Sequence, residues 1–217
     1  MALSRADAVS YRQYGASVNP SYLSVAVWIN SNNNGGSNSY VTCVNKALAA
    51  ATPGSWGLSM DQTAKKIRFV TCWSGSTVES ATGGSLPLHE WHHIGGVYDG
   101  SNTILYVDGN QTIGKARTST MPALNVAIRC FERNASPTPG TNDWDCSLAE
   151  LGYWAVALTP AEMAVLASGA SPLSIRPSSL VIYDPMFLSS HNRFSLSTTD
   201  SGTLTNVTHP RITGVGG

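Results

Sequence analysis

Residues 91–109, WHHIGGVYDGSNTILYVDG, contain the clearest structural signal in the sequence. Two strand-like stretches, Trp91–Tyr98 and Thr103–Val107, are separated by Asp99-Gly100-Ser101-Asn102, four residues that favour turns. Asp108-Gly109 follows directly, and this dipeptide suits the positive φ angles of a tight hairpin turn. The stretch therefore predicts an antiparallel β-hairpin whose second strand leads into another turn.

Strand signals extend on both sides of this hairpin. Short apolar or alternating runs, separated by Ser, Asn and Gly clusters, occur at residues 23–30, 40–44, 56–60, 67–72, 126–130 and 148–156, with weaker runs at 180–183 and 203–208. Many short strands at this spacing favour an antiparallel β-sandwich.

One helix is also expected, at Thr159–Ser168, because Thr159-Pro160-Ala161-Glu162 is a capping box with proline at the first helical position. We expect this helix to cover one end of the sandwich.

The composition limits the classes of partner. The chain has 217 residues, of which 12% are charged, against about 25% in a typical soluble protein. Lys and Arg number 13 and balance 13 Asp and Glu, so no basic face is expected for a nucleic acid. No apolar run is long enough to span a membrane, and residues 1–7 lack the apolar segment of a secretory signal. We therefore expect neither a nucleic-acid nor a membrane partner.

The four cysteines leave two alternatives open. Cys43, Cys72, Cys130 and Cys146 match no zinc-binding spacing, because no Cys-x-x-Cys pair is present. They can be reduced, small apolar residues within strands. Alternatively, Cys130 and Cys146 form a disulfide that closes the turn-rich stretch between them.

The hairpin, together with Leu148–Trp154 and Ala157–Glu162, resembles the central hairpin, final strand and closing helix of laminin-G-like, concanavalin A-like domains. The resemblance implies an all-β, antiparallel jelly-roll sandwich over residues 1–172. Residues 173–217 would then be a C-terminal extension that packs on the sandwich or on a neighbouring subunit. Motifs in this extension, Ile175-Arg176-Pro177 and His209–Ile212 among them, are similar to C-terminal segments of phage structural proteins that carry this domain.

Catalytic patterns known from this fold are missing from the sequence. Glucanases with the fold carry Glu-x-Asp-x-(x)-Glu on one strand, which places a nucleophile and an acid/base about 5 Å apart. None of the five glutamates is followed two residues later by aspartate, and no Gly-x-Ser-x-Gly motif occurs. His92 and His93 are adjacent in a strand, so they point to opposite faces and cannot share one metal ion. We expect a protein that is not an enzyme.

One loop has the composition of a ligand site. Relatives of this fold often hold calcium at the rim of the sandwich, and calcium requires six to eight oxygen ligands. In Asn142-Asp143-Trp144-Asp145, two carboxylates flank an indole that could stack on a sugar, so these four residues are the predicted ligand site, with calcium at Asp143 and Asp145. The alternative is that Trp144 packs inward and the aspartates are solvated or cap turns. Trp56 and Trp73, which border loops, are further candidates for stacking.

The sequence leaves two candidate functions for the protein. The first is a non-enzymatic structural protein of a bacteriophage virion, made in the bacterial cytoplasm: a capsid decoration, head fibre or tail-surface adhesin. Its partners would be capsid or tail proteins, and the extension would support a homo-oligomer such as a trimer. The second is a carbohydrate-binding module for bacterial surface attachment, with calcium as the candidate cofactor. A third class, a lyase or glycosidase, lacks an acid/base pair in the sequence.

Overall fold

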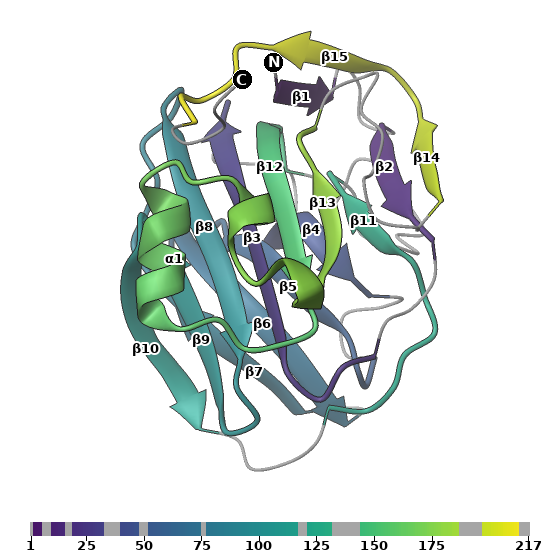
Figure 1. Cartoon of the computed structure of the whole chain (residues 1–217), viewed down its shortest axis with the longest axis vertical. Helices are drawn as coiled ribbons and strands as arrows, with labels where there is room; N and C mark the ends of the chain where they lie inside the picture. The colour runs from purple at the N-terminus through teal and green to yellow at the C-terminus, as the bar shows by residue number, and fades with distance from the viewer. Residues whose placement is uncertain are drawn as a thin grey trace.

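The computed structural model describes residues 2–5, 10–15, 19–32, 40–47, 52–74, 77–116, 121–131, 144–186 and 197–212. They form two antiparallel sheets packed face to face, with one short helix on the outside (Figure 1). The all-β jelly-roll sandwich expected from the hairpin is therefore confirmed.

The first sheet, sheet A, has the strand order β10-β9-β8-β3-β12-β1-β15, and β13 also pairs with β12. Its strands are β1 (Ala2–Arg5), β3 (Leu23–Ser31), β8 (Trp91–Tyr98), β9 (Asn102–Val107), β10 (Asn110–Ala116), β12 (Cys146–Trp154), β13 (Leu180–Asp184) and β15 (Leu204–Val207). The second sheet, sheet B, has the order β14-β2-β11-β4-β5-β6-β7. Its strands are β2 (Tyr11–Tyr14), β4 (Tyr40–Lys46), β5 (Trp56–Asp61), β6 (Lys66–Ser74), β7 (Thr77–Thr82), β11 (Ile128–Cys130) and β14 (Thr198–Ser201).

The predicted hairpin is β8 and β9, paired from Ile94–Val107 to Tyr98–Thr103. Its two turns form as their residues predict. Asp99 accepts hydrogen bonds from the backbone N–H groups of Ser101 and Asn102 at 2.8 and 2.6 Å. Asp108 and Gly109 have φ angles of 48° and 77°, which suit the tight turn into β10.

The core lies between the two sheets, where alternate residues of each strand meet. In β3, Val25, Val27 and Ile29 are fully buried on the inner face, as period-two alternation requires. Trp56 of sheet B stacks on Tyr153 of sheet A with ring centroids 5.3 Å apart, so this pair joins the sheets directly.

Two adjacent glycines in β8 allow close packing on opposite faces. A Cβ on Gly95 would lie 2.2 Å from Met163 of the helix outside the sheet. A Cβ on Gly96 would lie 2.2 Å from the ring of Phe69, which is fully buried on the inner face of sheet B. The Gly-Gly pair therefore sets how closely both the helix and the opposite sheet approach β8.

Replacing Gly96 with alanine is expected to lower the free energy of unfolding by about 1–3 kcal/mol, because the added methyl group overlaps the Phe69 ring. Gly84→Ala is the matched control, since its Cβ meets no atom within 4 Å, and a change within about 0.5 kcal/mol is expected. Urea unfolding followed by tryptophan fluorescence measures both. Equal stabilities of the two variants would contradict this account of the packing.

The helix α1 (Pro160–Ala167) begins as the sequence predicts. Thr159 accepts the N–H of Glu162, and the Glu162 side chain accepts the N–H of Thr159, which completes the capping box. Its position differs from the expectation: α1 lies over the outer face of sheet A and not at an end of the sandwich (Figure 1). The reason is an apolar patch on that face, where Met163 and Leu166 pack with Val97 and Tyr106.

The C-terminal segment is built into both sheets. After the turns η1 (Pro172–Ser174) and η2 (Pro177–Ser179), β13 pairs with β12, β14 with β2 and β15 with β1. The two ends of the chain are therefore neighbours in the structure, as Figure 1 shows. Residue 172 marks no structural boundary in the described part of the chain. A contact of this segment with a neighbouring subunit stays a prediction.

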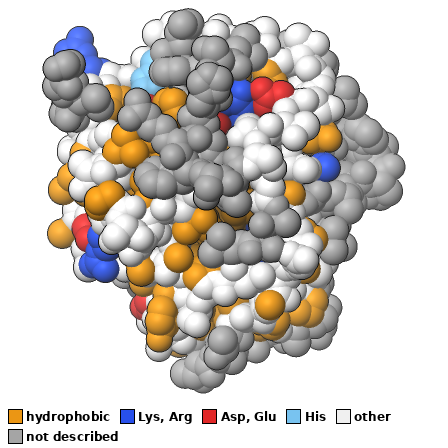
Figure 2. All heavy atoms as spheres, turned by 45° about the vertical axis from the view of Figure 1, so that its right-hand side comes forward, with side chains coloured by type: hydrophobic (Ala, Val, Ile, Leu, Met, Phe, Trp, Pro, Cys, Tyr) orange, Lys and Arg blue, Asp and Glu red, His pale blue; other side chains and the backbone are white. Residues whose placement is uncertain are grey.

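Charged side chains are sparse on the face shown in Figure 2. Blue and red atoms appear there as isolated groups among apolar and uncharged polar atoms. This pattern agrees with the low content of charged residues, 12% of the chain. A helix long and apolar enough to cross a membrane does not occur among the residues that the structure describes.

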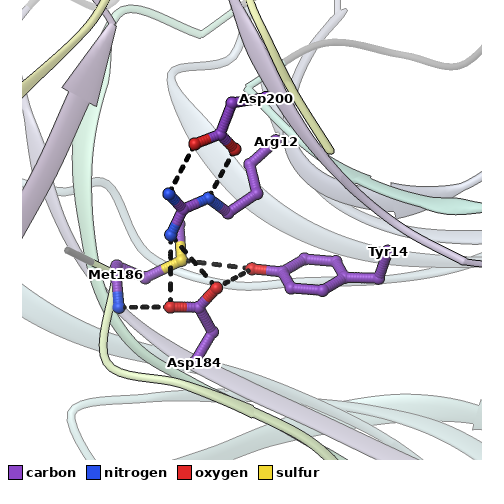
Figure 3. A network of polar contacts seen from close by, with 5 residues as sticks. All are labelled: Arg12, Tyr14, Asp184, Met186 and Asp200. Carbon is purple, nitrogen blue, oxygen red and sulfur yellow. Dashed lines mark hydrogen bonds and ion pairs between the residues drawn. The ribbon is translucent and has the colours of Figure 1, made fainter. Parts of the chain in front are cut away.

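One ionic network is buried and joins the two ends of the chain (Figure 3). Arg12 of β2 binds Asp200 of β14 through two hydrogen bonds of 2.7 Å and binds Asp184 of β13 at 3.2–3.3 Å. The hydroxyl of Tyr14 donates to Asp184 at 2.9 Å, and the backbone N–H of Met186 donates to it at 2.6 Å. Arg12 and Asp184 are at most 1% exposed, so the network holds the C-terminal strands on β2 from inside.

Candidate functional site

The predicted site around Trp144 is only partly within the described residues. Asn142 and Asp143 lie outside them. Trp144 is fully buried, and its indole N–H donates to Ser31 Oγ at 2.8 Å, so the ring cannot stack on a sugar. This corrects the predicted role of Trp144: the inward alternative holds because β3 offers the indole an acceptor. Asp145 accepts a hydrogen bond from the Asn32 side chain at 3.0 Å.

Calcium at Asp143 and Asp145 stays a prediction. Calcium needs six to eight oxygen ligands, and the described part of this loop supplies one carboxylate, Asp145. Within the ranges that the structure describes, no three His, Cys, Asp or Glu side chains are grouped so that they could hold a metal ion.

The cysteines are reduced and buried, which corrects the disulfide prediction. Cys130 lies in β11 of sheet B, whereas Cys146 begins β12 of sheet A, and both are free thiols. Burial raises the pKa of Cys43 to about 12, so this thiol is held in its unreactive protonated form.

The two other stacking candidates, Trp56 and Trp73, also turn inward, as does one of the five glutamates, Glu150. Trp56 and Trp73 are 3% and 5% exposed, so neither is a stacking surface. Glu150, the glutamate within β12, is 7% exposed and accepts the hydroxyl of Tyr183 at 3.0 Å, with His209 Nε2 at 3.2 Å from its other oxygen. Its described contacts are thus a phenol and an imidazole, not the second carboxylate that glycoside hydrolysis requires.

The structure instead shows a groove on the outer face of sheet A, beside the start of α1. Its volume is about 460 Å³, within the range of about 300–1,000 Å³ common for ligand pockets. We call it the α1 groove. Its polar lining consists of Asp99, Asn102, Tyr106 and Gln111; its apolar lining consists of Val97, Ile104, Leu158 and Pro160, with Gly114 at the edge.

The strand pairing explains how these residues come together. Gln111 of β10 lies opposite Tyr106 of β9 in the antiparallel ladder, and the Tyr106 hydroxyl donates to Gln111 Oε1 at 3.4 Å. The loop after β12 closes the other side. It is fixed to the sheet by Ser24, whose hydroxyl accepts the N–H of Leu158 and donates to the carbonyl of Val156, both at 2.8 Å.

The turn at Asp99–Asn102 contributes the charged end of the groove. The Asn102 side chain donates to both Asp99 oxygens, at 3.1 and 3.4 Å. Burial, and then the Asp99 carboxylate, raises the pKa of Tyr106, so its hydroxyl is a hydrogen-bond donor at neutral pH. On the other side of this turn Tyr22 is 49% exposed and lies against Gly100, where a Cβ would be 2.5 Å from its ring.

The comparisons with known proteins identify the family. The laminin G family model described as the concanavalin A-like lectin/glucanases superfamily matches residues 4–164. The chain belongs to the concanavalin A-like superfamily. The resemblance stated from the hairpin is thereby confirmed, and this superfamily includes both binding domains and enzymes, as its description says. No curated protein sequence matches the chain.

Solved structures show the same concanavalin A-like fold at low sequence identity. A putative carbohydrate-binding protein from Bacteroides ovatus matches with a TM-score of 0.66 and 15% identity, over 95% of this chain and 59% of its own. A heptameric SAP-like pentraxin from Limulus polyphemus matches with 0.64 and 14%, over 94% of this chain and 93% of its own. A Trypanosoma rangeli sialidase matches with 0.51 and 16%, over 67% of this chain and 22% of its own. At these identities the likeness concerns the fold alone.

The α1 groove of this concanavalin A-like domain is not predicted by the sequence. The prediction that Asp99 forms a turn is confirmed, but the same turn also lines the groove, which was not predicted. The signal was present in the register: once β9 and β10 are a hairpin, Tyr106 and Gln111 must be neighbours on one face. The other wall, formed by the loop after β12 and by Pro160 at the start of α1, could not be read from local sequence.

Proposed function

We propose that this protein is a non-enzymatic carbohydrate-binding domain whose ligand lies in the α1 groove. The observation that supports the proposal is the lining: side-chain amides, a phenol and a carboxylate surround an apolar floor. Sugars present the same mixture, because their hydroxyls need hydrogen-bond partners and their C–H faces pack on apolar groups. The similarity to a structure described as a carbohydrate-binding protein supports the same class of ligand.

Variants of two neighbouring amide residues on β10, one inside the groove and one outside it, test the proposal. Gln111 lines the groove, whereas Asn110 is also exposed but lies outside it. Gln111→Ala should weaken binding of a glycan identified on an array about three- to tenfold, the effect of one hydrogen bond. Gln111→Trp should abolish binding because the indole fills the groove.

Asn110→Ala is the control and should leave the dissociation constant unchanged in isothermal titration calorimetry. Undiminished binding by Gln111→Trp, or no binding to any glycan on the array, would overturn the proposal.

Calcium assistance is a separate proposal, because Asp145 is not among the groove residues. Binding at the α1 groove should therefore survive chelation by EDTA. Calcium bound near Asp145 should instead raise the melting temperature of the wild-type protein but not that of Asp145→Ala.

The virion role stays a prediction. It is compatible with carbohydrate binding, since a decoration or tail-surface protein can bind host glycans. It derives from the C-terminal motifs, and the oligomer predicted with it is also untested. Mass spectrometry of purified phage particles tests the role, and sedimentation of the purified protein tests the oligomer. A monomer that is absent from particles would remove this candidate.

A further inference from the structure

Among the described residues that line the α1 groove, Asp99 is the one charged side chain and none is a cation. Within the described part of the chain, no ion pair to Asp99 occurs. The nearest pairing along α1 is between Glu162 and Arg176, in which the cation is already matched by a carboxylate. The described lining of the groove therefore presents a negative charge to a ligand without a lining cation to balance it.

The hydrogen bonds inside the groove determine which atoms remain for a ligand. The Asp99 Oδ1 atom accepts two backbone N–H groups, whereas Oδ2 accepts one bond, from Asn102 Nδ2. Oδ2 therefore keeps lone pairs. The side-chain oxygen of Asn102 is a further acceptor, since the hydrogen bonds of this side chain to Asp99 use its nitrogen. Gln111 accepts the Tyr106 hydroxyl through Oε1, which leaves its NH₂ group as a donor.

Acceptors therefore outnumber donors at the charged end of the groove. A carboxylate or sulfate on a sugar would meet these acceptors without a cation to balance it, and the unpaired charges would repel. A hydroxyl can donate to them, and an ammonium group can donate with charge assistance.

We propose that the α1 groove selects sugars by charge, taking neutral or amine-bearing sugars and excluding sialic, uronic and sulfated ones. This inference rests on the proposed function, and it adds the class of ligand and the residue, Asp99, that sets it. Burial and, second to it, the Asp99 carboxylate raise the pKa of Tyr106, another residue that lines the groove.

The experiment uses glycan probes with the same linkage and length that differ in one charged substituent on each sugar. β-1,4-linked tetramers of glucose, glucosamine and glucuronic acid are titrated into the full chain at pH 6, alongside an array of matched neutral, amino and acidic glycans. The glucosamine tetramer should bind about tenfold or more tightly than the glucose tetramer, as expected for a charge-assisted hydrogen bond. The glucuronic acid tetramer should bind more weakly than either.

Two variants assign the effect to Asp99. Asp99→Asn keeps an oxygen that can accept the turn N–H groups, so it should fold, and the ratio of affinities for the amino sugar and the neutral sugar should fall at least tenfold. Asp61→Asn is the matched control: Asp61 likewise accepts the N–H groups of Thr63 and Ala64 in a turn, but it lies in sheet B outside the groove.

The possible results distinguish failure of charge selection from failure of carbohydrate binding. Acidic glycans that bind as well as neutral ones, or a preference that persists in Asp99→Asn, overturn the charge selection and leave carbohydrate binding in place. Absence of binding to every glycan on the array overturns the proposed function itself.

Discussion

Replacing Asp184 with alanine is expected to lower the free energy of unfolding by about 3–5 kcal/mol, the cost of removing one partner of a buried ion pair, because Arg12 would keep only the partly exposed Asp200. Arg12 is 1% exposed and Asp184 fully buried, so water cannot replace the missing carboxylate. The Tyr14 hydroxyl and the Met186 N–H would lose their acceptor as well. Urea denaturation measures the loss, which should change little between low and high salt because the pair is shielded from solvent.

Asp200→Ala is the matched control for this prediction. Asp200 binds the same guanidinium, but its side chain is 35% exposed, and Arg12 would keep Asp184 as a partner. Its cost should be less than half that of Asp184→Ala. If the two variants are equally stable, the buried pair is not the element that holds the strands.

A double variant keeps the test usable if Asp184→Ala does not fold. Arg12→Met combined with Asp184→Leu removes both buried charges together, and well-packed apolar replacements of buried ion pairs are commonly tolerated. Recovery of a cooperative unfolding transition in this variant is expected. A double variant that is less stable than the single one would contradict the explanation.

The free energy of unfolding is expected to fall by about 2 kcal/mol between pH 7 and pH 5 because of His93 alone. His93 is buried, with its ring edge-on to Trp28 at 5.6 Å, and burial lowers its pKa to about 4, against a smaller opposing effect of Asp108. The unfolded chain takes up a proton near pH 6.5, whereas the folded chain does so only near pH 4. Stability therefore decreases as the pH falls through this window.

The measurement compares pH dependence rather than absolute stability. Urea unfolding at pH 7, 6 and 5 should show a decrease in the wild type that is about 2 kcal/mol larger than in His93→Gln. His89 is exposed, so His89→Gln should retain the wild-type dependence. An unchanged dependence in His93→Gln would show that another group causes the decrease.

Local sequence predicted the elements whose signals are local. The Asp-Gly turn at residues 108–109 and the capping box at Thr159 each specify their own geometry, and both formed as expected. The strands β1, β2 and β14 were not predicted, because they are short and gain their hydrogen bonds from partners far along the chain. Their formation depends on the assembled sheets more than on their residues.

The candidate site shows the same division. Trp144 has polar neighbours that suggest exposure, but its burial is decided by Ser31, more than a hundred positions earlier. The α1 groove depends on where α1 lies on sheet A, which is set by an apolar patch assembled from β3, β8 and β9. Sequence predicted β8, β9 and the start of α1, but neither β10, which carries Gln111, nor that these elements enclose a groove.

The pairing of β1 with β15 has a consequence for synthesis on the ribosome. Ala2 is aligned with Val207, and Tyr11 with Ser201, so β1 and β2 bond with strands that are translated much later. These ladders cannot close until residues 198–207 have emerged from the ribosome. A nascent chain halted before residue 198 would leave β2 without its β14 partner.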